Sequence, residues 1–304
     1  MSDIESFTKI NRFSGINNVD PEYRLSPTII DYKPHYPLRE ANNVEIDNTY
    51  GLSSRRGYTS VLPGTDIHSM WADSEGKWWM FVDGDSLYQL DNIYNSLLLR
   101  SGLQSGTRMS YAPVVDRLYY TNNYQIGYIK SNMDNQLTDP ERAFKMPLPP
   151  GQYVEYFRGC LYVASDQELY ISDPLCDYFD IRTGYRRFKS AIRMLRAVDT
   201  GLYISDDRIR FLSGYANEDF ELKESYPVPA IPFTDLVVNA DFIGSEAGGK
   251  VIIVTSEDGI CLGDENGKVT NLTSTAYQFT KRGQGTAFIR EHSGGVRHYI
   301  NTLY

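Results

Sequence analysis

Pairs of neighbouring carboxylates come closest, among the side chains of this sequence, to a pattern that performs chemistry. Two carboxyl groups that flank a glycosidic bond are the core of most glycoside hydrolysis. The candidate pairs are Asp83 with Asp85, Asp206 with Asp207, Glu257 with Asp258, and Asp264 with Glu265. Each pair follows a short apolar run, where acidic residues are expected in turns for conformational reasons alone. We therefore expect turn residues here and keep a glycan-cleaving enzyme as the alternative.

Other catalytic and metal-binding patterns are missing from the sequence. The four histidines are His35, His68, His292 and His298, and neither they nor the three cysteines have metal-ligand spacing. The segment 244–250 has the glycine and lysine spacing of a phosphate-binding loop, but Val251 stands where a magnesium-binding Ser or Thr is needed. The sequence therefore predicts no catalytic residues, no metal site, no cofactor and no enzymatic activity.

Charge is unevenly distributed along the chain. The net charge is −9, which argues against a general nucleic-acid-binding surface. Residues 199–271 hold 14 acidic and 5 basic side chains. The stretch before them contains no acid and six bases, which are Arg182, Arg186, Arg187, Lys189, Arg193 and Arg196. This pattern predicts either two solvated faces or a charge-complementary contact with a neighbouring subunit.

Length and composition favour a globular protein with a sizeable core. The chain has 304 residues, of which 41% are hydrophobic, and it contains no apolar stretch long enough for a membrane helix. Its acidic first residues do not resemble a signal peptide. Three cysteines are too few for a disulfide framework. We expect a soluble protein without a membrane span that folds in a reducing compartment.

Repeats decide the expected architecture. Short aromatic or aliphatic runs that end in small polar residues recur at intervals of 39 to 50 residues. They occupy residues 79–83, 118–122, 161–165, 202–206, 252–256 and 298–302. Self-similarity at this period, with strand-forming residues between turn residues, predicts a β-propeller. Many of the 24 tyrosines fall on strand positions, which favours blade packing over a carbohydrate-binding surface.

Six blades account for residues 43–304. They are expected to begin near residues 66, 108, 152, 191, 236 and 285. Weaker outermost strands are predicted at residues 95–99, 143–146, 219–223 and 269–273. The last repeat supplies only two strands, so we predict that residues 43–62 complete it, because propellers protect their edges by closing the ring.

The segment 1–42 is predicted to be an extended N-terminal arm. It contains four prolines and little periodicity, yet it carries too many apolar residues for a purely solvated tail. Packing on its own propeller or on a neighbouring subunit would use them. The contact candidates are Phe7, Phe13, Ile16 and Tyr23.

Three motifs near the N-terminus resemble one known family. They are Phe-Ser-Gly-Ile-Asn at 13–17, an Ala-Asn-Asn-Val-Glu-Ile-Asp strand at 41–47, and Gly-Leu-Ser-Ser-Arg-Arg-Gly-Tyr at 51–58. The pattern resembles the N-terminal region of bacteriophage virion propellers, which include the packaged-DNA stabilisation and nozzle-type tail proteins of short-tailed phages. The ring-closure candidates in this region are Val44, Ile46, Arg55, Arg56, Gly57 and Tyr58.

The resemblance implies a structural role in a virion. Such propellers form rings around the tail axis, contact the portal or its adaptor and neighbouring copies, and help to retain or conduct DNA. It implies a homo-oligomeric tail or head-to-tail connection protein that is made in the cytoplasm of a host bacterium. Nozzle proteins are usually longer, so a peripheral tail-decorating or fibre-adaptor position stays open. A glycan-binding or glycan-cleaving propeller is the other alternative.

Overall fold

The fold is built almost entirely from β-strands. The computed structural model describes residues 12–42, 44–46, 49–54, 57, 59–73, 76–214, 219–244, 248–279, 282–291 and 297–304. Within these ranges the helices are two short 3-10 turns, η1 (Glu22–Arg24) and η2 (Ala240–Ile243). Neither is a candidate to cross a membrane, and the described residues contain no other helix. The predicted all-β class is confirmed.

Five four-stranded antiparallel sheets follow one another along the chain. Each is a meander whose strands pair in sequence order, apart from a short excursion in the third. The first comprises β6 (Ile67–Ala72), β7 (Trp78–Asp83), β8 (Ser86–Asp91) and β9 (Ser96–Arg100). The second comprises β10 (Ser110–Val114), β11 (Arg117–Thr121), β12 (Ile126–Lys130) and β13 (Met133–Asn135). The third comprises β15 (Tyr153–Phe157), β16 (Cys160–Ser165), β17 (Glu168–Ile171) and β19 (Tyr185–Arg187).

The fourth and fifth sheets repeat this plan. The fourth comprises β20 (Met194–Ala197), β21 (Gly201–Ser205), β22 (Ile209–Ser213) and β23 (Glu221–Tyr226). The fifth comprises β24 (Leu236–Asn239), β25 (Lys250–Ser256), β26 (Gly259–Gly263) and β27 (Val269–Asn271). Tight turns join the strands; between β7 and β8, for example, Gly84 adopts a φ of +62°, which glycine reaches without steric cost.

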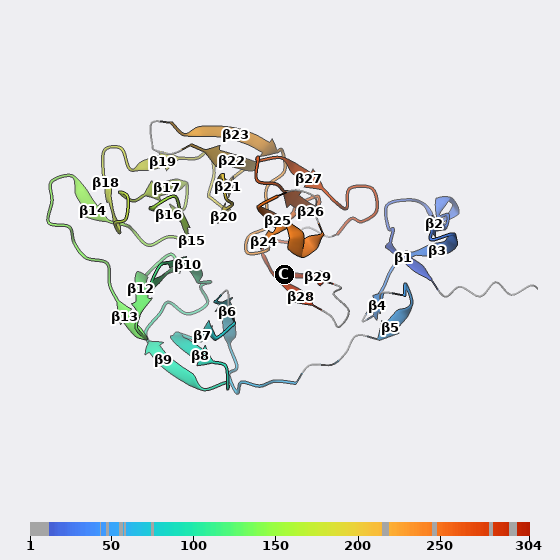
Figure 1. Cartoon of the computed structure of the whole chain (residues 1–304), viewed down its shortest axis with the longest axis horizontal. Helices are drawn as coiled ribbons and strands as arrows, with labels where there is room; N and C mark the ends of the chain where they lie inside the picture. Colours follow the sequence, from blue (N-terminus) through green and yellow to red (C-terminus); the bar gives the residue numbers. More distant parts are fainter. Residues whose placement is uncertain are drawn as a thin grey trace, which may run out of the picture.

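Successive sheets pack face to face. Each of four buried clusters draws its apolar side chains from two neighbouring sheets, from the first and second through to the fourth and fifth. The largest fully buried side chains include Tyr120, Tyr153 and Tyr203, so these strand tyrosines do serve blade packing. The sheets are arranged in an arc around a common centre (Figure 1), which is the radial plan of a β-propeller.

The outer strand of the second sheet differs from the prediction. We expected it at residues 143–146, but β13 occupies this position, and β14 (Lys145–Pro147) pairs instead with β18 (Tyr178–Asp180). Two ion pairs hold Lys145 beside the third sheet, to Asp173 at 2.6 Å and to Asp180 at 3.3 Å. Ser131 and Asn132 both adopt positive φ, which lets β13 follow β12 through a tight hairpin turn.

Two shorter hairpins come from opposite ends of the sequence. β28 (Gly285–Glu291) pairs with β29 (Arg297–Leu303), and β4 (Val44–Ile46) pairs with β5 (Leu52–Ser54). No backbone ladder joins the two hairpins among the described residues. An ion pair of 2.6 Å does connect them, between Arg290 of β28 and Glu45 of β4. The two hairpins are therefore in contact through their side chains.

The N-terminal arm has more regular structure than we expected. Its described part forms a three-stranded sheet of β1 (Phe13–Ile16), β3 (Lys33–Leu38) and β2 (Thr28–Ile30), in that order. The prolines of this segment are tolerated because the sheet is small and consists largely of edges. The wholly buried ring of His35 lies edge-on against Tyr50, which ties the arm sheet to the β4–β5 hairpin.

Asn18 fixes the arm to the far end of the chain. Its side-chain amide donates to the carbonyl of Gln278 at 2.7 Å and accepts from the N–H of Gln278 at 2.8 Å. Its backbone N–H donates to Ala276 at 3.1 Å. The arm is therefore hydrogen-bonded to its own propeller, one of the two packing modes that the sequence left open.

Candidate functional site at the propeller axis

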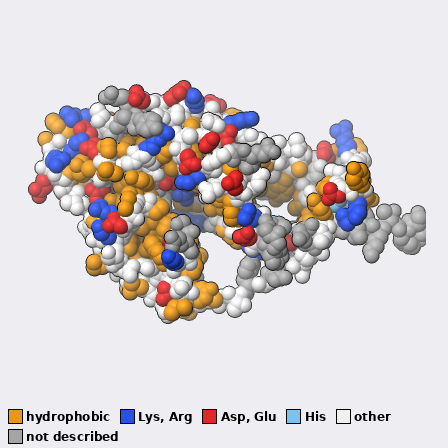
Figure 2. Space-filling view, in the orientation of Figure 1, with side chains coloured by type: hydrophobic (Ala, Val, Ile, Leu, Met, Phe, Trp, Pro, Cys, Tyr) orange, Lys and Arg blue, Asp and Glu red, His pale blue; other side chains and the backbone are white. Residues whose placement is uncertain are grey.

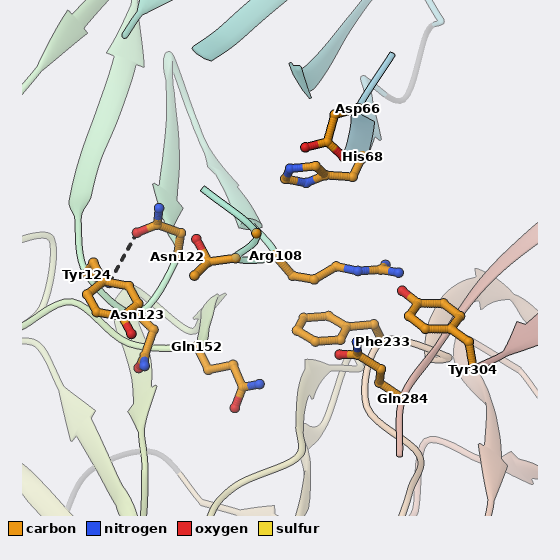
Figure 3. Close-up of a pocket in the computed structure, with 12 residues that line it drawn as sticks. Asp66, His68, Arg108, Asn122, Asn123, Tyr124, Gln152, Phe233, Gln284 and Tyr304 are labelled. Carbon is orange, nitrogen blue, oxygen red and sulfur yellow. Dashed lines mark hydrogen bonds between the residues drawn. The ribbon is translucent and has the colours of Figure 1, made fainter. Parts of the chain in front are cut away.

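The connections between several sheets meet around one central cavity. It has a volume of about 470 Å³. The residues that line it are spread along the sequence from Asp66 to Tyr304. Figure 3 shows the side chains that reach it from different sheets. They include His68 of β6, Arg108 before β10, Gln152 before β15, Phe233 before β24 and Gln284 before β28. The fold thus brings both halves of the chain to a single site.

Arg108 is held between two aromatic rings in this cavity. Its guanidinium carbon lies 5.2 Å from the ring centre of Phe233 and 5.4 Å from that of Tyr304. Such cation–π contacts fix the planar group and strengthen when water is excluded. Partial burial lowers the pKa of Arg108 from its ordinary value. Within the described part of the chain, the guanidinium has no ion pair and no hydrogen bond.

Three polar amide side chains line the same cavity as Arg108. The amide oxygen of buried Asn122 accepts from the N–H groups of Tyr124 at 3.1 Å and Gln125 at 2.8 Å, so its NH₂ group is the end left for other partners. The side chains of Gln152 and Gln284 also line the cavity and make no hydrogen bond within the described ranges.

His68 adds a polar atom whose bonding capacity is unused. Its Nδ1 lies 2.7 Å from the hydroxyl of Ser69, which accepts from the N–H of Met109, so Ser69 can donate its own proton to Nδ1. That arrangement places the ring proton on Nε2, a buried atom without a hydrogen-bond partner. Burial lowers the pKa of His68 and favours its neutral form at pH 7.

The backbone around the cavity is conformationally unusual. β6 contains a bulge between His68 and Trp71, and Ser69 has a φ of 55°. Phe233, one of the two rings that hold Arg108, has a φ of 64°. Positive φ is uncommon for bulky residues and persists only where the surroundings enforce it. Positive φ also occurs at many turns elsewhere in the described residues, so it is the convergence of polar side chains from several sheets that marks this cavity as a candidate site.

An ion cluster lies beside the cavity on the inner strands of three sheets. Arg196 of β20 pairs with Asp235, whose side chain is 1% exposed, and lies 3.7 Å from Glu155 of β15. Burial raises the pKa of Glu155, although Arg196 opposes that effect. The two carboxylates raise the pKa of Arg196 despite its burial. One arginine thus pairs with the buried carboxylate of Asp235 and the partly buried carboxylate of Glu155.

The acidic pairs predicted from sequence form structural bonds. Asp206 is wholly buried and accepts from Arg210 at 2.8 Å, and Asp207 pairs with Lys189 at 2.9 Å. Asp258 accepts from the hydroxyl groups of Tyr226 and Ser256. Among the described residues, no cluster of three or more metal-ligating side chains occurs.

The basic stretch is spread over two sheets and the connection between them. Arg186 and Arg187 lie on β19 and Arg196 lies on β20, so the stretch does not form one continuous surface loop. Three of its members pair with acids of segment 199–271 in the same chain: Lys189 with Asp207, Arg193 with Glu257, and Arg196 with Asp235. Arg182 pairs with Asp180 at 2.7 Å, which lowers the pKa of that carboxyl. Arg186 stacks on Phe220, and Arg187 is exposed.

The other predicted contact residues occupy the N-terminal region. Phe13 and Ile16 are partly buried in the arm sheet, whereas Tyr23 is 82% exposed. Val44 and Ile46 lie on β4, and Gly57 is exposed beyond β5. Phe7, Arg55, Arg56 and Tyr58 lie outside the described residues. The axial residues Arg108 and Phe233 escaped sequence analysis because neither lies in a motif and 125 positions separate them.

Comparison with known proteins extends to the fold. No protein-family model matches the sequence, and no curated protein matches it. One similar structure is the extracellular domain of a B. thetaiotaomicron protein assigned to the hybrid two-component systems, with 12% identity and a TM-score of 0.50 over 80% of this chain and 31% of that one. A second similar structure is a gluconolactonase from Xanthomonas campestris, with 13% identity and a TM-score of 0.46 over 68% of this chain and 75% of that one. A third is the WD40 β-propeller domain of Doa1, with 14% identity and a TM-score of 0.41 over 67% of each chain. The chain is thus an all-β protein with β-propellers among its structural neighbours.

Proposed function

We propose that this chain is a non-enzymatic structural protein of a bacteriophage particle, located in the tail or the head-to-tail connection. The observation that carries the proposal is the N-terminal segment that resembles virion propellers. Part of that segment folds as the β4–β5 hairpin and contacts β28 through Glu45 and Arg290. Glu45 of the motif therefore contacts the last repeat, which is where the proposed closing hairpin would lie.

The same contact supports a six-bladed ring. In this proposal β28 and β29 form the inner half of the sixth blade and β4 and β5 its outer half. The cavity adds support, because Asp66 of the first repeat and Tyr304 of the last line the same space. Closure would protect the β28–β29 sheet, whose Phe288 is 46% exposed, from pairing with other chains.

The role of DNA in this proposal is limited by the size of the axis. A cavity of about 470 Å³ is of the size that holds a small molecule, so a duplex cannot pass through one propeller. A DNA passage would have to lie between several copies arranged in a ring. The net charge of −9 would then discourage DNA from adhering to the protein walls.

The arm supplies a surface for neighbouring proteins. Tyr23 and Ile29 are 82% and 65% exposed, and Tyr32 is fully exposed on the turn before β3. Figure 2 shows the arm projecting from the rest of the molecule with hydrophobic side chains on its surface. Exposed aromatic side chains on a small sheet are suited to contacts with the portal, its adaptor or a neighbouring copy. Arg187 would add a charge to such contacts at the outer edge of the third sheet.

A peripheral position is the second candidate. The outer strand β9 exposes Leu97 and Leu98 by about half, beside Ile93 and Tyr94. An apolar outer strand is a site for pairing with an added strand, as in a fibre adaptor or a tail-decorating protein. This surface lies on the first sheet, far along the chain from the arm, so the two positions call for different neighbours.

Quantitative mass spectrometry of purified particles tests the proposal. We expect the protein in virions of the phage whose genome encodes it, at a small copy number fixed by the symmetry of its partner. A variant lacking residues 1–40 should fold but fail to enter the particle, because it has lost the arm surface. Absence of the full-length protein from the particles would overturn the assignment.

A further inference from the structure

We propose that the axial cavity binds a small hydroxylated carboxylate, of the chemical class of the sugar acids, and that Arg108 holds the carboxylate group. This inference goes beyond the structural role above and does not depend on it. A protein absent from virions could still bind such a ligand, and a virion protein could fail to do so.

The charge of Arg108 is the first argument. Arg108 is half-buried, and a guanidinium that has lost part of its hydration is stabilised by an accompanying anion. The two flanking rings provide cation–π attraction but no hydrogen-bond acceptor of carboxylate strength. Burial is the main cause that lowers the pKa of Arg108, and no carboxylate is among the groups that oppose it. A ligand carboxylate could accept two parallel hydrogen bonds from this fixed planar group.

Hydrogen-bonding groups on the wall of the same cavity are the second argument. The buried Nε2 of His68 and the free amide NH₂ of Asn122 are both suited to donate to an oxygen atom. Gln152 and Gln284 can each donate and accept, which matches the dual character of hydroxyl groups. Asp66 is the one acid among the lining residues, and it lies at the exposed rim beside His68.

The size of the cavity narrows the class of ligand further. A cavity of about 470 Å³ falls within the range of about 300–1,000 Å³ typical of small-molecule sites. A monosaccharide acid fits within this range. Together, these features describe a preformed polar site with one strong cationic anchor.

Calorimetric titration of the full-length protein tests the proposal, with D-glucuronate as the probe and D-glucose and inorganic phosphate as comparisons. We expect glucuronate to bind more tightly than either, because glucose lacks the carboxylate and phosphate lacks the hydroxylated ring. Arg108→Gln should weaken glucuronate binding about 10- to 100-fold through loss of the charge-assisted hydrogen bonds. Arg187→Gln, which removes an exposed arginine of β19, should leave it unchanged.

A second variant covers the case in which Arg108→Gln does not fold. Tyr304→Ala removes one of the two rings at the last position of the sequence, where the side chain is 48% exposed, and should weaken binding several-fold while the melting temperature stays near that of the wild type. The proposal is overturned if glucuronate does not bind, if it binds folded Arg108→Gln and the wild type equally, or if Tyr304→Ala leaves its affinity unchanged. If glucose binds as tightly as glucuronate, Arg108 does not hold a ligand carboxylate. If inorganic phosphate binds as tightly as glucuronate, the cavity is not specific for a sugar acid.

Discussion

The single positive charge of Arg196 neutralises two carboxylates that come from different sheets. Its positive charge serves Asp235 and Glu155, which come from the fifth and third sheets, while Arg196 itself belongs to the fourth. Sequence analysis located the basic stretch and the acidic region, but it could not pair them, because these partners are 39 and 41 positions from Arg196. Repeats of similar length bring such distant positions to equivalent places on neighbouring sheets.

Removing this charge should be costly. Arg196→Met removes the cation but keeps an unbranched side chain, and it leaves the buried carboxylate of Asp235 and the partly buried one of Glu155 without it, so we expect the free energy of unfolding to fall by about 3 kcal/mol. Lys189→Met is the matched control, because its ion pair with Asp207 involves a lysine side chain that is 74% exposed. Loss of this ion pair should lower the free energy of unfolding by less than about 1 kcal/mol. Urea denaturation measures both values, and equal losses would contradict a special role for Arg196.

At the scale of elements, local patterns predicted the strands better than their partners. The inner strands begin at Ile67, Ser110, Tyr153, Met194, Leu236 and Gly285, within three residues of the predicted blade starts. The repeat marks these starts because each aromatic run is buried against a neighbouring sheet. The outer strand of the second sheet was misplaced because a three-residue strand after a tight turn carries little apolar signal, whereas 143–146 carries more.

The pairing of the two terminal hairpins can be tested by exchanging charges. Glu45→Arg or Arg290→Glu should each lower the free energy of unfolding by about 2 kcal/mol, because each places like charges together at a partly buried contact. The double variant should recover more than half of that loss. Glu221→Arg, on the exposed strand β23, is the control and should change the free energy of unfolding by less than about 0.5 kcal/mol. Failure of the double variant to recover would argue against the contact.

At the scale of the whole molecule, the order of the sheets follows from the repeat, but the course of the arm does not. Periodicity is a local property, and it predicted six repeats; the need to protect the last edge then predicted a hairpin at residues 43–62. The arm sheet and the bonds of Asn18 to Ala276 and Gln278 are specified by single residues without a recurring pattern. The axial cavity is likewise assembled from connections between blades, where the sequence carries no repeat.

Truncation separates the arm from the predicted ring closure. Removal of residues 1–40 should leave a soluble protein that unfolds cooperatively, because the five four-stranded sheets and both terminal hairpins remain. Removal of residues 1–62 also deletes β4 and β5 and should expose the edge of the β28–β29 sheet, which gives aggregation or loss of cooperativity. Size-exclusion chromatography and thermal unfolding distinguish these outcomes. A cooperative, monomeric protein that lacks 1–62 would rule out closure by this hairpin.

The bonds between Asn18 and residues 276–278 also constrain the timing of biosynthesis. A ribosome adds about 5 to 20 residues per second, so the partners of Asn18 are made on the order of 15 to 50 seconds after it. During that interval the five meanders can fold one after another as they emerge, since each is made of contacts between near neighbours in sequence. During the same interval the arm lacks its contacts with residues 276–278, so a chaperone or an assembly partner would have access to its apolar side chains.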